Sequence, residues 1–189
     1  MKKLLSVLLT LVMLVPAFGS FPVIASAESA VAQVVDSNGN ATDHTTFEAA
    51  WKAAVGGKAT FKLLSDWTGN GKFGASEASL DSSLYFNGGA LSVPSGYTVT
   101  IDLNGHTINR SKGVNQITND GSVIRLFDGA SITINDTSES KNGSIEGGSS
   151  NYGGGIYAPS NNTVTMNGGR IRLCNGYYGG GVYVDSNSK

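Results

Sequence analysis

The sequence has few of the residues that bind metals or form cross-links. Its 189 residues include one cysteine, Cys174, and two histidines, His44 and His106. A lone cysteine excludes an internal disulfide, and a structural zinc site needs several Cys or His ligands. The two histidines lie in separate contexts, so they predict neither a metal site nor a Ser-His-Asp triad. We therefore expect no cofactor, and we interpret Cys174 as a small packed residue, with a reactive or intermolecular thiol as the alternative.

Charge is also scarce. Charged residues make up 14% of the chain, and the net charge is −1. A weakly acidic chain without clusters of Lys and Arg argues against nucleic acid and anionic membranes as partners. Beyond residue 27, no apolar run approaches the roughly 20 residues of a membrane helix. We expect no further segment to cross a bilayer.

The N-terminus predicts export. Lys2 and Lys3 precede an apolar run over residues 4–15, and Ala25-Ser26-Ala27 fits a signal-peptidase site. An uncleaved anchor is the alternative, but the run is short for a span. Removal of residues 1–27 takes away two of 13 basic residues and none of 14 acidic ones, leaving 162 residues with a net charge of −3. We expect one secreted or cell-surface domain with its own core.

Residues 28–58 predict an N-terminal cap. Residues 32–35 read as a short strand and Asn38-Gly39 as a turn. Thr45 and Glu48 form a capping-box pattern. One helical face follows, ended by Gly56-Gly57, and its residues are Phe47, Ala50, Trp51 and Ala54. Such a helix would cover the first coil of a stacked fold.

A repeat of 26 residues marks the C-terminal part. Gly153-Gly154-Gly155-Ile156-Tyr157 returns as Gly179-Gly180-Gly181-Val182-Tyr183, and the same shift relates Tyr152 to Tyr178. A period of this length indicates units that bury their apolar face only by stacking on neighbours. Short apolar stretches separated by Gly and Asn predict that each unit is a coil of short strands.

Residues 59–189 are expected to form the coils, with a long Gly/Ser-rich loop at about 65–84. From Thr98 onward, three coils can be written out. Their strands are expected at 99–103, 107–109 and 123–127, then at 132–134, 144–146 and 155–158, then at 163–166, 170–173 and 181–184. Alternation predicts that one set of side chains points inward: Val99, Ile101, Leu103, Ile124, Leu126, Ile132, Ile134, Ile145, Ile156, Val164, Met166, Ile171, Leu173, Val182 and Val184. Asn-Gly pairs at 104–105, 142–143, 167–168 and 175–176 are expected between strands, with stacked Asn side chains hydrogen-bonded along the fold.

These residues carry a resemblance to a known family. The segment 97–108, Met166-Asn167-Gly168-Gly169 and the Gly-Gly-Gly-Ile/Val-Tyr strands resemble right-handed parallel β-helix surface proteins of gut-type Gram-positive bacteria, within the pectate-lyase-like superfamily of folds. The resemblance covers about residues 45–189. It implies a right-handed parallel β-helix with a short helical cap, and it leaves the activity open, because members include adhesins, other surface proteins and polysaccharide-active enzymes.

Carboxylates are the candidates for catalysis. The resemblance implies that a lyase would cluster acids around Ca²⁺ beside a basic residue, and that a hydrolase would place several Asp around the glycosidic bond. The acids and bases near strand ends are Asp102, Asp128, Asp136, Arg125 and Lys141. Their spacing puts no two acids on one outward column, and Asp in such turns usually caps backbone N–H groups. A lyase or glycoside hydrolase therefore stays the alternative, with no catalytic residue assigned.

Tyrosines are the candidates for binding. Five of seven lie in the last 38 residues, and the expected register points Tyr157 and Tyr183 outward one coil apart, with Arg125 in the same column one coil earlier. Exposed aromatic rings suit sugar rings, which makes a polysaccharide or a host or cell-surface glycan the candidate partner. The other interpretation is a structural ladder of stacked rings, which we favour over binding.

The expected protein is thus a non-catalytic, adhesin-like or structural segment. The strand at 181–184 is followed by the start of a turn, without a C-terminal counterpart to the helical cap. We expect further coils of the same polypeptide beyond Lys189, because an open coil edge needs cover.

Overall fold

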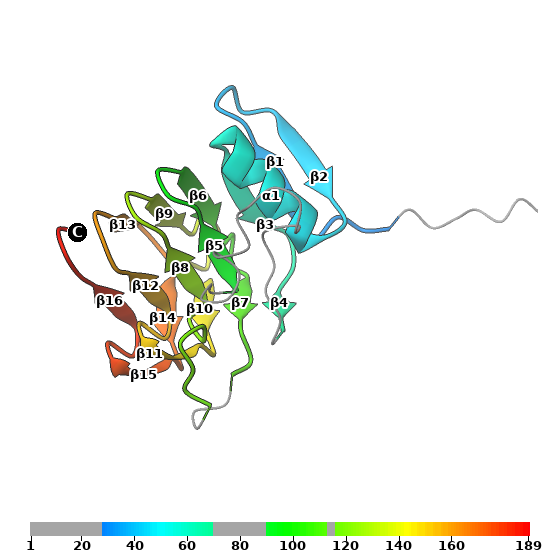
Figure 1. Ribbon diagram of the computed structural model, residues 1–189. Coiled ribbons are helices and arrows are strands. Elements are labelled where there is room, and N and C mark those ends of the chain that lie inside the picture. Colours follow the sequence, from blue (N-terminus) through cyan, green and yellow to red (C-terminus); the bar gives the residue numbers. More distant parts are fainter. Residues whose placement is uncertain (1–27, 70–89, 113–115) are drawn as a thin grey trace, which may run out of the picture.

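A computed structural model describes residues 28–69, 90–112 and 116–189 (Figure 1). The expected leader, residues 1–27, lies outside the described residues, as does the expected loop from residue 70 onward. The chain is mostly β with one short helix. In order, its elements are β1 Ala32–Val35, β2 Ala41–His44, α1 Phe47–Gly57, β3 Thr60–Leu63, β4 Trp67–Thr68, β5 Leu91–Val93, β6 Thr98–Asp102, β7 Thr107–Asn109, β8 Ile124–Leu126, β9 Ser131–Asn135, β10 Ser144–Glu146, β11 Ser149–Tyr152, β12 Ile156–Ala158, β13 Thr163–Met166, β14 Arg170–Arg172, β15 Asn175–Tyr178 and β16 Val182–Val184.

The strands form three larger sheets and one small sheet. The first sheet has the order β13-β9-β6-β3-β1-β2, the second β14-β10-β7-β4 and the third β16-β12-β8-β5, while β11 pairs with β15 alone. The two pairings of β1 are antiparallel, and all the other pairings among the described strands are parallel. The chain adds one strand to each of the three larger sheets in the same order four times, as in β6-β7-β8 and then β9-β10-β12. We call each of these passages through the three sheets a turn of the stack. Successive turns stack from α1 at one end to β13 and β16 at the other (Figure 1).

The pairing register agrees with the repeat. Ile101 pairs with Ile134, and Ile134 with Met166, as the sequence predicts. In the second sheet Ile108, Ile145 and Ile171 are aligned. The buried apolar side chains come from all three larger sheets and from α1, and they form one cluster. Stacking of like residues from turn to turn therefore builds the core.

In the last turn, four residues of the predicted inward set are exposed. Met166 is 41% exposed, Val182 41%, Val184 47% and Leu173 73%. The first three lie on β13 and β16, the edge strands of their sheets, so no neighbouring strand covers their outer side. Leu173 falls just after β14 with φ of 50°, a left-handed conformation that redirects its side chain.

The N-terminal cap forms as a helix packed on an antiparallel hairpin. Residue Thr46, not Thr45, is the N-cap, and its Oγ1 accepts a hydrogen bond from the Ala49 N–H. The helix ends at Gly57, as predicted, and the next residue, Lys58, is its left-handed C-cap. Trp51 is fully buried and meets the Phe61 ring edge-on at 5.4 Å. Because β1 pairs antiparallel with β3, the first parallel strand has no free edge.

Five strands differ from the sequence expectation. The unpredicted strands are β2, β4, β5, β11 and β15. Asn175-Gly176 lies inside β15 rather than between strands, and β4 lies inside the expected loop at 65–84. The predicted Asn stacking is present, since Asn167 Nδ2 donates to Asn135 Oδ1 at 2.9 Å and Asn161 Nδ2 donates to Asp128 at 2.8 Å.

Candidate functional site

The outward column of the third sheet has the predicted composition. Arg125 on β8, Tyr157 on β12 and Tyr183 on β16 are directly paired across three successive turns. Ser92 on β5 occupies the same column in the turn before. All three predicted site residues are half-buried. The structure therefore brings them together on one face.

A triple glycine folds the chain sharply between β11 and β12. A Cβ on Gly154 would lie 2.4 Å from the Asn175 carbonyl oxygen, and a Cβ on Gly155 would lie 2.5 Å from the Gly181 carbonyl oxygen. No other residue fits such contacts without a shift of the backbone. The corner brings Tyr152, which precedes it, against Tyr157, which follows it, with stacked rings 5.6 Å apart. The repeated Tyr-Gly-Gly-Gly-x-Tyr pattern thus encodes a corner with a tyrosine on each side.

Four rings meet at this corner, and we call Tyr152, Tyr157, Tyr178 and Tyr183 the tyrosine cluster. Tyr152 stacks on Tyr178 of the next turn at 5.1 Å and meets Tyr183 edge-on at 5.1 Å. Tyr157 and Tyr183 are 5.7 Å apart. Tyr178 is 59% exposed and Tyr152 36%. The sequence analysis assigned only the tyrosine that follows the corner in each repeat, Tyr157 and Tyr183. The 26-residue shift that relates Tyr152 to Tyr178 was the signal for the other two.

The guanidinium of Arg125 lies against aromatic rings. Its Cζ is 4.7 Å from the centroid of Tyr157 and 5.0 Å from that of Phe127, distances typical of cation–π contacts. Its Nε is buried without a hydrogen-bond partner. Desolvation by burial lowers the pKa of Arg125, partly offset by the interaction with Tyr157. Within the described part of the chain, no carboxylate forms an ion pair with this guanidinium.

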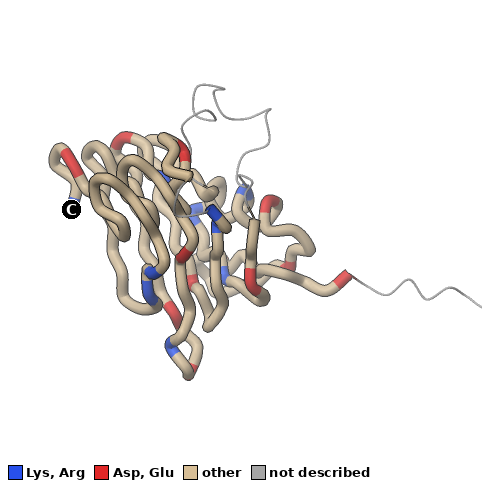
Figure 2. The backbone as a smooth tube through the Cα atoms, turned by 90° about the horizontal axis from the view of Figure 1, so that it is seen from below, with Lys and Arg blue, Asp and Glu red and all other residues tan. Residues whose placement is uncertain are grey.

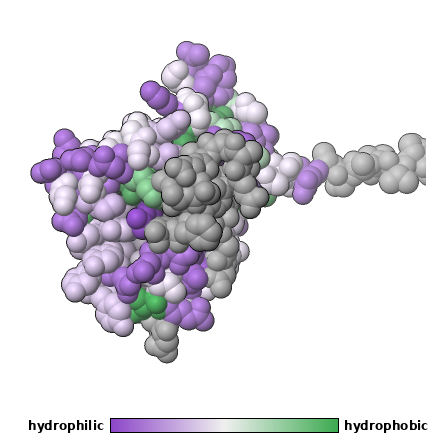
Figure 3. All heavy atoms as spheres, viewed as in Figure 1, coloured by the Kyte–Doolittle hydropathy of each residue, from purple (hydrophilic) through white to green (hydrophobic). Residues whose placement is uncertain are grey.

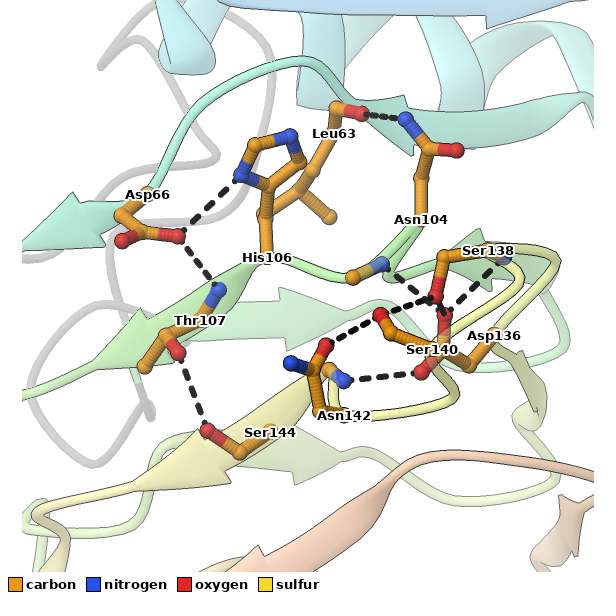
Figure 4. Close-up of polar contacts among 12 residues, drawn as sticks. Leu63, Asp66, Asn104, His106, Thr107, Asp136, Ser138, Ser140, Asn142 and Ser144 are labelled. Atoms are coloured by element: carbon orange, nitrogen blue, oxygen red, sulfur yellow. Dashed lines mark hydrogen bonds and ion pairs between the residues drawn. The ribbon is translucent and has the colours of Figure 1, made fainter.

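The carboxylate of Asp136, the most buried candidate acid, accepts hydrogen bonds from the loops around it (Figure 4). Its carboxylate accepts hydrogen bonds from the Gly105 N–H at 2.9 Å, the Gly143 N–H at 2.8 Å and the Ser138 hydroxyl at 2.7 Å. Desolvation raises the pKa of Asp136, but these hydrogen bonds outweigh it, so the net shift is downward. A carboxylate held in its charged form by several donors is a structural acceptor rather than a proton donor.

The other candidate acids and bases have local partners too. Asp102 accepts from the Thr137 hydroxyl at 2.6 Å and from the Asn104 N–H at 3.0 Å. Asp128 accepts from Asn161, and Lys141 Nζ donates to the Asp136 carbonyl at 2.6 Å. These contacts support the interpretation that Asp residues cap the turns between strands.

In the described residues, no metal-binding group forms around the histidines or Cys174. His106 Nδ1 lies 3.2 Å from Asp66, as Figure 4 shows, and His44 ends β2. Among residues 28–69, 90–112 and 116–189, no group of three His, Cys, Asp or Glu side chains could hold a metal ion. Cys174 packs against the core, and burial raises the pKa of its thiol, which keeps it protonated.

Charged residues of both signs are few in the described part of the chain. Figure 2 shows the Lys and Arg positions scattered along it among Asp and Glu positions. The face seen in Figure 3 is mainly polar, with apolar atoms in small separate patches. In the part of the chain that the structure describes, no helix is long and apolar enough to span a membrane. No protein-family model, curated protein or solved structure gives a significant match to the chain.

Proposed function

We propose that this chain is a right-handed parallel β-helix with a helical cap and belongs to a secreted or cell-surface protein. Its role is non-catalytic, adhesin-like or structural, and it contacts glycans through the tyrosine cluster. The architecture is supported by the repeated order of the three larger sheets and by the aligned core residues. The resemblance of residues 45–189 to β-helix surface proteins and the expected leader support the location.

The observation that carries the glycan contact is the exposure of the cluster. Paired aromatic rings on neighbouring strands stabilise a sheet by themselves, at about 0.5–1.5 kcal/mol per pair. A ladder that served stability alone would gain most from full burial, yet Tyr152 remains 36% exposed although β15 of the next turn pairs with its strand. Tyr178, on the edge strand β15, is 59% exposed. Sugar rings offer apolar C–H faces flanked by hydroxyls, which match aromatic faces flanked by phenol groups. The cluster presents both on the outside of the fold.

The rival function, a lyase or hydrolase of polysaccharides, has less support. Its acids would have to act on a substrate, but Asp102 and Asp136 are buried acceptors of turn hydrogen bonds. The one buried carboxylate on the outer face of the second sheet, Glu146, is paired with Arg172 at 2.7 Å. Glycosidic bond cleavage needs two carboxyl groups facing one bond. The tyrosine cluster is therefore the better candidate site.

The test is glycan binding by a double variant, Tyr157→Ala with Tyr183→Ala. Binding to a glycan array is expected to be weak, roughly millimolar per site, because a flat site buries little of its ligand. The double variant should lose that binding and also some thermal stability. Tyr97→Ala is the matched control, since Tyr97 is 40% exposed and lies outside the cluster. Unchanged binding by a folded double variant would refute the site.

A further inference from the structure

We propose that the tyrosine cluster and Arg125 form one site that selects negatively charged sugar units, those carrying a carboxylate or a sulfate. The inference rests on the proposed glycan contact and adds to it the chemical class of the ligand. It also enlarges the site, because Tyr152 and Tyr178 join the three residues that the sequence indicated.

The first step is the placement of the positive charge. Arg125 occupies the outward column one turn before Tyr157, and its guanidinium lies over the Tyr157 ring. A sugar stacked on the tyrosine cluster would therefore have a cation beside it along the direction in which the turns stack. The half-buried side chain keeps part of its surface open to a ligand.

The second step is the absence of an internal counterion. Two acids that follow residues of the column in sequence have other partners: Asp128, three residues after Arg125, accepts from Asn161, and Asp185, two residues after Tyr183, accepts from the Tyr183 hydroxyl at 3.1 Å. In the described segments the guanidinium of Arg125 lies against two aromatic rings and has no ion-pair partner, and its Nε has no hydrogen-bond acceptor. A planar guanidinium binds carboxylate or sulfate oxygens through paired hydrogen bonds, so its charge is available to an acidic ligand.

The third step weighs a purely structural role. Leu or Met at this position could also fill the space beside the rings. Neither would carry the free-energy cost of removing a charge from water. A cation partly withdrawn from water and held between Phe127 and Tyr157 is therefore better explained by a ligand than by packing. By contrast, Arg172 in the second sheet forms an ion pair with Glu146.

The experiment compares matched acidic and neutral ligands. Binding of the protein spanning residues 28–189 is measured for hyaluronan oligosaccharides, for the same oligosaccharides with their carboxyl groups reduced to alcohols, and for carrageenan oligosaccharides before and after removal of their sulfate groups. We expect each acidic form to bind about tenfold more tightly than its neutral counterpart, and the difference to shrink as salt is added. Arg125→Gln should abolish the difference. Arg170→Gln, which removes one positive charge from the second sheet, should leave it unchanged.

The outcomes separate the two proposals. Equal binding of acidic and neutral forms by the wild type, with loss of both on changing Tyr157 and Tyr183, would overturn the charge selection and leave the glycan site standing. Binding to no carbohydrate by the folded protein would overturn both. Thermal unfolding of Arg125→Gln checks that the variant is folded. Retained acid preference in a folded Arg125→Gln variant would also overturn the inference.

Discussion

At the scale of single residues, close backbone contacts decide where only glycine is possible. A Cβ added to Gly155 would meet both the Gly181 carbonyl oxygen and Ile171 Cγ2 at 2.5 Å. Ile171 is held by the pairing of β14 with β10, and the Gly181 carbonyl accepts from the Ile156 N–H at 2.9 Å, so both have little freedom to move aside. The corner that joins the two halves of the tyrosine cluster therefore depends on this position.

We expect Gly155→Ala to lower the free energy of unfolding by about 1–3 kcal/mol through overpacking. Gly56→Ala is the control, because Gly56 lies in α1 with no atom within 4 Å of the new Cβ. It should raise stability by up to about 1 kcal/mol, since alanine favours a helix over glycine. Urea denaturation measures both. Equal effects of the two changes would contradict the close packing of the corner.

Asp136 is the residue whose charge should couple stability to pH. Its pKa is lowered in the folded protein, so its contribution is fully present above the unfolded pKa of about 3.9 and is lost as pH falls through the folded value. Asp136→Asn should cost about 1–3 kcal/mol at pH 7, because the Gly143 N–H would lose its acceptor oxygen. The difference between variant and wild type should shrink towards pH 2. Glu139→Gln controls for the loss of one charge in the same loop. A difference that is constant from pH 7 to pH 2 would show that the charge of Asp136 is not what matters.

At the scale of elements, alternation along a strand decides which changes the fold tolerates. In β9, Ile134 is fully buried between Ile101 and Met166, whereas Thr133 lies on the outer face between Thr100 and Thr165. Ile134→Asp should abolish cooperative unfolding, because burial of an unpaired carboxylate costs several kcal/mol. Thr133→Asp should change stability by less than about 1 kcal/mol. Circular dichroism during thermal unfolding distinguishes them, and similar losses at both positions would mean that the register is wrong.

Most elements with apolar alternation could be predicted from the sequence, with β5 as an exception, and polar ones could not. The strands around Ile101, Ile134 and Ile145 were expected, and so was the helical face of Ala50, Trp51 and Ala54. By contrast, β11 and β15 read SSNY and NGYY, with no apolar residue to fix their inner face. These two strands carry Tyr152 and Tyr178, so half of the tyrosine cluster was missed with them. Their pairing depends on contacts between turns, which no local pattern records.

At the scale of the whole molecule, the two ends of the stack differ. Next to α1, the hairpin of β1 and β2 covers the edge of β3, and Trp51 covers Phe61. At the other end β13, β14, β15 and β16 are all edge strands, and Met166, Val182 and Val184 are each more than two-fifths exposed. The last residues cover part of this edge: the Lys189 carbonyl accepts from the Val164 N–H, the Lys189 N–H donates to the Asn162 carbonyl, and the Ser188 hydroxyl accepts from the Asn162 N–H.

Such an edge pairs with similar edges, so a protein spanning residues 28–189 should self-associate through this face as its concentration rises. Charges placed on the edge should suppress the association: Met166→Lys and Val184→Lys each leave a long stem on the apolar surface while the ammonium reaches water. Thr165→Lys is the control, because Thr165 is exposed on the outer face of the same strand, next to Met166. Light scattering across a concentration series should show larger particles for the wild type and for Thr165→Lys than for the two edge variants. A wild type that stays monomeric at high concentration, or an equal effect of all three lysines, would mean that the last turn protects its own edge, and that the exposed side chains of β13 and β16 are tolerated without a partner.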